Sequence, residues 1–100
     1  MKVYISGPIT NNPDYMKDFQ DAEDLLLKEG NVPVNPTKIS PYNKKKVWSD
    51  YMKDDIKALM DCDAIYLLHG WTESRGARLE HELAVILDLK IFAELVKNVQ

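Results

Sequence analysis

Apolar and polar positions alternate with a changing period along the chain, and these changes predict strands and helices in turn. Short apolar runs bounded by turn residues predict strands at residues 2–6, 31–34, 63–69 and 90–93. Apolar residues at helical spacing predict helices from the region of residues 11–14 up to Gly30, from Trp48 to about Met60, and over residues 74–88. The segment 37–47 is polar and shows no steady period, so we expect a loop that can overhang a pocket.

This alternation of strands and helices predicts one α/β layer fold with a parallel sheet and right-handed crossovers. The nearly continuous apolar run at residues 63–69 is typical of a central parallel strand that helices cover on both faces. One hundred residues suffice for a single compact domain over residues 1–100 and are too few for two.

Two acidic residues fall on the apolar faces of their predicted helices. Glu80 lies within the arc that Ala77 and Leu83 help to form, and Asp55 lies between Met52 and Leu59. A carboxylate that faces a core is costly unless it is paired, hydrogen-bonded or turned toward a cleft. A structural ion pair, or a helix shifted by one residue, accounts for such positions about as well as a functional role does.

These acids are expected to meet at one edge of the sheet. In open parallel sheets, ligands bind outside the carboxyl ends of the strands, where the turn at residues 7–10 and the loop at residues 70–74 both open. Glu80 and Asp55 can converge there, with Tyr4 projecting from the first strand. Two such carboxylates indicate a nucleophile and a proton donor acting on a glycosidic bond. A purely structural role remains open for two residues: Tyr4 can be an ordinary core aromatic residue, and Trp71 can serve in packing.

Charge and composition limit the partners of the protein. A net charge of −3 and a pI near 5.3 argue against binding of a nucleic acid polymer, and the basic run at residues 44–46 is typical of a solvated loop. The single Cys62 fits a reducing compartment, and no long apolar span or signal peptide is visible, so we expect a cytosolic protein that does not enter a membrane. His69 and His81 lack a second ligand at metal spacing, and neither a metal nor another cofactor is expected.

Four stretches of the chain together resemble the nucleoside 2-deoxyribosyltransferase-like superfamily, and within it a family of short, largely uncharacterised bacterial and phage domains. They span most of the chain and are Tyr4-Ile5-Ser6-Gly7-Pro8-Ile9, Trp48 through Asp55-Ile56, Cys62-Asp63-Ala64-Ile65, and Gly70-Trp71 followed by Ser74-x-Gly76-Ala77-x-x-Glu80-x-x-x-Ala84. Their order and spacing are specific for the superfamily and much less specific for the substrate.

The resemblance implies a small flavodoxin-like or Rossmann-like three-layer fold with a parallel sheet of about four strands. It also implies cleavage or transfer at the N-glycosidic bond of a 2′-deoxynucleoside or its 5′-monophosphate, without a cofactor. Glu80 matches the nucleophilic glutamate, Asp55 the aspartate that contacts and helps to protonate the leaving base, and Tyr4 the tyrosine that orients the nucleophile. The positions that match substrate-binding residues are Ser6, Gly7, Pro8, Ile9, Gly70, Trp71, Ser74 and Gly76.

Ser74 indicates which substrate to expect. Similar transferases that act on free nucleosides carry an acid at this position, whereas the similar nucleotide hydrolases carry serine, so a deoxynucleoside 5′-monophosphate is the expected small-molecule partner. Pro8 departs from the small polar residue of those hydrolases, and Arg75 is a candidate to compensate. The resemblance further implies a homodimer or higher homo-oligomer. The alternative is an accessory module of the same fold that binds nucleotides without significant turnover.

Overall fold

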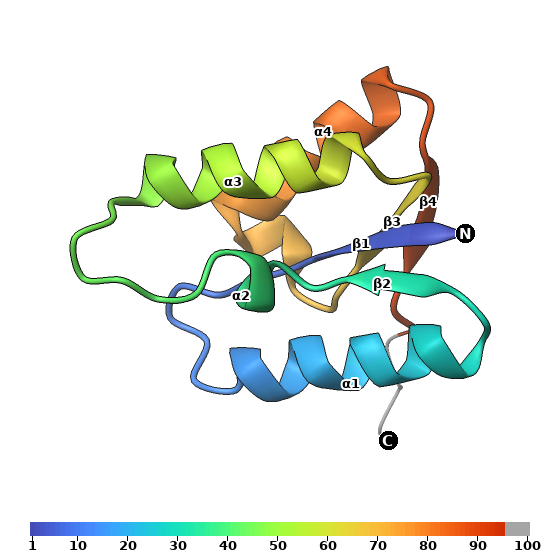
Figure 1. Cartoon of the computed structure of the whole chain (residues 1–100), viewed down its shortest axis with the longest axis horizontal. Coiled ribbons are helices and arrows are strands. Elements are labelled where there is room, and N and C mark those ends of the chain that lie inside the picture. Colours follow the sequence, from blue (N-terminus) through green and yellow to red (C-terminus); the bar gives the residue numbers. More distant parts are fainter. Residues whose placement is uncertain (96–100) are drawn as a thin grey trace.

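A computed structural model describes residues 1–95 of the chain as one sheet with helices packed on it (Figure 1). The sheet has four parallel strands in the order β2-β1-β3-β4. The elements in chain order are β1 (Lys2–Ser6), α1 (Tyr15–Lys28), β2 (Val32–Val34), α2 (Pro36–Ile39), α3 (Trp48–Met60), β3 (Ala64–Leu67), the 3-10 helix η1 (Trp71–Glu73), α4 (Arg75–Ile86) and β4 (Lys90–Ala93). Within residues 1–95, none of the helices combines the length and apolar character that a membrane crossing requires.

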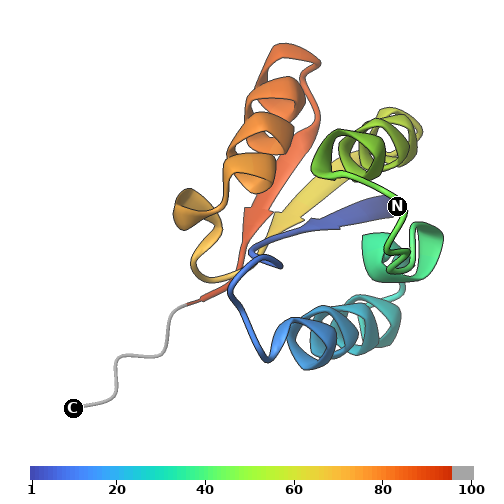
Figure 2. The ribbon, with the colours of Figure 1, turned by 90° about the vertical axis from the view of Figure 1, so that its left-hand side faces the viewer.

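Side chains of β1 alternate between two faces of the sheet, and each face has its own apolar cluster. Val3 and Ile5 pack with Phe19 of α1, while Tyr4 packs with Leu59 of α3 and with residues of β3 and α4. Seen along the sheet, α1 covers one face, and α3 and α4 cover the other (Figure 2). The expected α/β fold with helices on both faces of a parallel sheet is therefore confirmed.

The structure corrects the prediction of an irregular loop from residue 37 onward. Residues Pro36–Ile39 form α2, a helix of four residues, which is too short to produce a readable hydrophobic period. Its start is nevertheless encoded locally. Asn35 accepts a hydrogen bond from the backbone N–H of Thr37 over 3.0 Å, and Pro36 occupies the first helical position, where its missing N–H costs nothing.

Smaller differences concern the ends of elements and the width of the buried face of α4. This helix ends at Ile86 and β3 at Leu67, each two residues before the predicted ends at residues 88 and 69. Of the apolar residues predicted to share one arc of α4, Ala77 and Ala84 are buried, but Leu79 is 38% and Ile86 68% exposed. The buried face is narrow, and Glu80 lies within it at 5% exposure.

The N-cap of α2 supports a prediction about stability. Asn35→Ala removes hydrogen bonds to the N–H and hydroxyl of Thr37 from a site that is 5% exposed. We expect the free energy of unfolding in urea to fall by about 1–2 kcal/mol. The matched control is Asp14→Ala at the N-cap of α1, whose side chain makes no capping hydrogen bond, so its effect should stay below about 0.5 kcal/mol. Equal effects of the two substitutions would contradict this account.

Candidate active site

Glu80 is held at the centre of the molecule by two hydroxyl groups from β1. Tyr4 Oη donates to Glu80 Oε2 over 2.6 Å, and Ser6 Oγ donates to Glu80 Oε1 over 2.7 Å. Tyr4 and Ser6 are two residues apart on the strand, so they point to the same face of the sheet. Burial raises the pKa of Glu80 to about 7, while the hydrogen bonds from Tyr4 and Ser6 oppose that rise by stabilising the carboxylate.

The second inward acid, Asp55, lies on the buried face of α3 and has a different environment. It is 8% exposed, and within the described residues its Oδ1 atom is buried without a hydrogen-bond partner. Burial, followed by the negative charge of Glu80, raises the pKa of Asp55 to about 7. Asp55 therefore stays neutral up to about pH 7, far above the range of an ordinary aspartate.

The two environments give the acids different tendencies to ionise. Both pKa values are raised to about 7, but the donors differ: Glu80 has a hydroxyl on each carboxylate oxygen, and Asp55 Oδ1 has none. Hydrogen bonds to a carboxylate favour its charged form, so we expect Glu80 to ionise before Asp55. The pKa of Tyr4 is raised well above its usual value by burial and by the charge of Glu80, so its phenol remains a proton donor in this contact. The arrangement can thus present one ionised and one protonated carboxyl group.

Both acids line a cavity of about 480 Å³ that lies between the helices and the ends of the strands. From the predicted site, the cavity wall includes Tyr4, Gly7, Ile9, Asp55, Ser74, Gly76 and Glu80. Gly7 is required by packing, because a Cβ atom there would lie 2.7 Å from Leu68 Cβ. The structure therefore gathers residues from β1, α3 and α4 around one hollow.

Four other predicted substrate-binding residues are placed differently. Ser6 is 1% exposed and lies behind Glu80, to which its hydroxyl is bonded. Pro8 and Gly70 lie against each other outside the lining, with 3.5 Å between Pro8 Cγ and a Cβ built on Gly70. Trp71 lines a second, shallow hollow, where its ring lies 4.5 Å from that of His81.

The cavity also has walls that the residue pattern did not identify. These come from the start of α1, from α2 and the segment after it, and from the first turns of α3: Tyr15, Met16, Phe19, Pro36, Thr37, Ser40, Pro41, Tyr42, Trp48, Tyr51 and Met52. Trp48 and Met52 share the apolar face of α3 with Asp55, and this helical spacing could have identified them as lining residues. Ser40 and Tyr42 lie in the segment 37–47, which was expected to overhang a pocket, but no pattern singled out these two residues as part of the wall.

A cationic group lies at the start of α4, beside the cavity. The guanidinium carbon of Arg75 is 4.0 Å from the centre of the Trp48 ring, and Trp48 itself lines the cavity. Ser74 caps α4 by accepting a hydrogen bond from the N–H of Ala77 over 3.2 Å, which leaves its hydroxyl hydrogen free to donate. Positive charge and hydroxyl donor thus flank the same rim.

The described residues contain no cluster of three or more His, Cys, Asp or Glu side chains that could hold a metal ion. His69 is exposed, and His81 lies beside Trp71 in the second hollow.

Comparison with solved structures identifies the class of fold. A 2-deoxyribosyltransferase from the psychrotolerant bacterium Bacillus psychrosaccharolyticus matches with a TM-score of 0.73 and 18% identity over 97% of this chain and 77% of its own. A 2-desoxiribosyltransferase from Leishmania mexicana matches with a TM-score of 0.69 and 22% identity over 92% of this chain and 62% of its own. The chain has a nucleoside 2-deoxyribosyltransferase-like fold, which confirms the resemblance at the level of fold.

The family is identified by a separate match. Residues 1–93 match the model of a domain of unknown function, DUF4406, and the chain belongs to this family. A comparison with curated proteins found no match.

The environment of Asp55 leads to a prediction about pH and stability. Because its pKa rises from 3.8 to about 7 on folding, the stability that this group contributes is complete below pH 3.8 and is lost as the pH rises through about 7. Asp55→Asn does not titrate, so at about pH 8 the variant should unfold roughly 5 °C above the wild type. At about pH 5 the difference should shrink or reverse.

Asp54→Asn is the matched control, measured by the same thermal unfolding at both pH values. The neighbouring Asp54 has its pKa lowered by Lys46 and Ser40, so its removal should not stabilise the protein at the higher pH. Stabilisation by Asp54→Asn equal to that by Asp55→Asn would contradict the assignment of the effect to burial.

Proposed function

We propose that the protein cleaves or transfers the N-glycosidic bond of 2′-deoxynucleoside 5′-monophosphates, with Glu80 as the nucleophile. The observation that carries this proposal is the asymmetry of two buried acids in one cavity. Glu80 accepts hydrogen bonds from Tyr4 and Ser6, whereas Asp55 Oδ1 has no hydrogen-bond partner among the described residues. The fold shared with two 2-deoxyribosyltransferases supports the same class of chemistry.

In the proposed reaction, the ionised carboxylate of Glu80 attacks C1′ of the deoxyribose. The C1′–N bond breaks, and its electron pair remains on the base, which receives a proton from Asp55. A glycosyl ester of Glu80 results. Water then attacks C1′ to give the free sugar phosphate, or a second base attacks to give a new nucleotide. Either step passes the proton of the attacking group to the Asp55 carboxylate and releases the Glu80 carboxylate. Tyr4 and Ser6 orient the nucleophile and keep it ionised.

The 5′-monophosphate is the preferred form of the substrate because the rim beside α4 favours an anion. The hydroxyl of Ser74 and the N-terminal end of α4 offer hydrogen-bond donors and a partial positive charge. Arg75, held on Trp48, adds a full positive charge next to them. A carboxylate at position 74 would instead repel a phosphate. Gly7, Ile9 and Gly76 complete the binding surface that we propose.

Four residues predicted to bind the substrate do not line the cavity: Ser6, Pro8, Gly70 and Trp71. We propose that they contribute indirectly, by positioning neighbouring residues.

Self-association and a cytosolic location stay predictions. Exposed apolar side chains that an interface could cover occur on α4 and β4, among them Val85, Ile86, Ile91 and Phe92.

The proposed reaction is tested by incubating the protein with the four deoxynucleoside monophosphates and measuring free base. We expect release by the wild type and a loss of at least about 10³-fold in Glu80→Gln, because the amide cannot act as the nucleophile. The control is Glu82→Gln, an exposed acid two residues along the same helix, which should leave the rate unchanged. Ligand-induced thermal stabilisation without any product would favour the alternative function, a nucleotide-binding module without turnover.

Arg75→Met tests the preference for a monophosphate. Removal of one charge-assisted hydrogen bond should lower kcat/KM for deoxynucleoside monophosphates roughly 10- to 100-fold, with little change for the matching deoxynucleosides. Arg78→Met is the control, because the Arg78 guanidinium is already bonded to the carbonyl oxygen of Thr72. An equal loss on both substrate types, or an equal effect of both substitutions, would argue against phosphate recognition by Arg75.

A further inference from the structure

The segment between α2 and α3, residues 40–47, forms one wall of the cavity and is attached to α3 mainly by side chains. Ser40, Pro41 and Tyr42 line the cavity, yet Tyr42 is 82% exposed. The N–H of Lys46 donates to the carbonyl oxygen of Asn43 over 2.9 Å, which makes a turn but does not tie the segment to a neighbouring element. A wall of this kind depends on its side-chain attachments.

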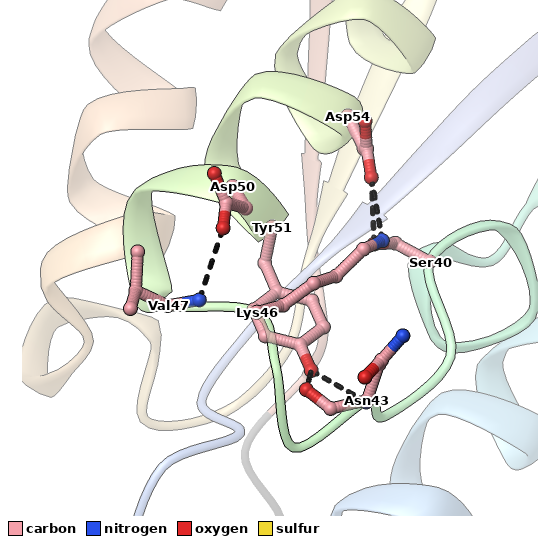
Figure 3. A network of polar contacts seen from close by, with 7 residues as sticks. All are labelled: Ser40, Asn43, Lys46, Val47, Asp50, Tyr51 and Asp54. Atoms are coloured by element: carbon pink, nitrogen blue, oxygen red, sulfur yellow. Dashed lines mark hydrogen bonds and ion pairs between the residues drawn. The ribbon is translucent and has the colours of Figure 1, made fainter.

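Besides the hydrogen bond from the Val47 N–H to Asp50 Oδ2 over 3.1 Å, two sets of side-chain contacts supply that attachment (Figure 3). Lys46 Nζ lies 3.0 Å from Asp54 Oδ2 and donates to Ser40 Oγ over 3.0 Å, while Ser40 Oγ donates to Asp54 over 2.9 Å. Tyr51 Oη accepts from the N–H of Asn43 over 2.7 Å and donates to its carbonyl oxygen over 3.0 Å. Asp54 and Tyr51 lie one turn apart on α3. Asp54 holds Ser40 and Lys46, near the two ends of the segment, and Tyr51 holds Asn43 in its middle.

These anchors are adjacent to the proposed proton donor. Asp54 precedes Asp55 in the chain and faces the segment, whereas Asp55 lines the cavity. Tyr51 both anchors the segment, through its bonds to Asn43, and lines the cavity. The position of the wall and the space beside Asp55 are therefore controlled from the same turn of α3.

The contacts are also suited to opening. Lys46 and Asp54 have side chains that are 31% and 39% exposed, and ion pairs with this exposure are weak and sensitive to salt. Segments with few backbone hydrogen bonds and exposed side chains open at low cost compared with the core. Loops that close over a site commonly exclude water and hold the substrate.

We propose that residues 41–46 form a gate over the cavity, latched shut by Lys46 on Asp54 and Ser40 and by Tyr51 on Asn43. The gate opens to admit the ligand and closes beside Asp55 once the ligand is bound. This inference rests on the proposed function for the identity of the ligand, but the latch itself does not.

The test compares Lys46→Met with Lys44→Met by amide hydrogen exchange and by binding of the deoxynucleoside monophosphates. Lys44 is an exposed lysine of the same segment and serves as the matched control. We expect amide exchange of residues 42–46 to become about tenfold faster in Lys46→Met only, and to slow when a monophosphate is added to the wild type. Association and dissociation of the ligand should both accelerate in Lys46→Met, because the closed form is less populated.

The charge-swapped double variant Lys46→Glu with Asp54→Lys should restore slow exchange, which neither single change would do. Unchanged exchange in Lys46→Met would overturn the latch. Faster exchange with unchanged binding rates would overturn the gate and leave a merely structural attachment. If the wild type bound none of the monophosphates, the proposed function and the role of the gate would both fail, while the exchange rates would still decide the latch.

Discussion

The hydrogen bonds from Tyr4 and Ser6 to Glu80 are the interaction on which the rest of the site depends. They join β1 to α4 across 76 and 74 positions of sequence, inside the apolar cluster between the sheet and the helices. A carboxylate in such a place would be strongly destabilising without donors. With a hydroxyl on each oxygen, it becomes a fixed and oriented group that helps to determine how α4 lies on the sheet.

Asp55 shows the opposite solution to the same physical problem. No donor among the described residues reaches its Oδ1 atom, and burial raises its pKa to about 7 instead. The protein thus contains one buried acid whose anion accepts two hydrogen bonds and one whose buried oxygen has no donor, so that burial favours its neutral form. That difference costs stability at higher pH, and a cost of this kind is understandable in a site whose proposed chemistry needs both forms.

The surroundings of the two acids divide into a rigid and a less constrained part. Tyr4 on β1 and Glu80 on α4 are both buried in the core, where packing restricts their positions. The wall at residues 40–42 is held by one partly exposed ion pair, Lys46 with Asp54, and by the hydroxyl of Tyr51. A site built in this way combines fixed reacting groups with a boundary that can move, and the two parts meet on α3 at Asp54 and Asp55.

What the sequence alone can predict depends on how far apart in the chain the interacting residues lie. The order of strands and helices, the parallel sheet and the inward direction of Glu80 and Asp55 could be predicted, because hydrophobic periods are local and repeat within a few residues. The four-residue helix α2 was missed, since so short an element has no period. The segment 37–47 was expected to overhang a pocket, but which of its residues line the cavity was decided only by the tertiary structure. The same holds for the position of Ser6 behind Glu80 and for the missing donor at Asp55. Each depends on contacts between residues far apart in the chain, and no local pattern of side chains carries that information.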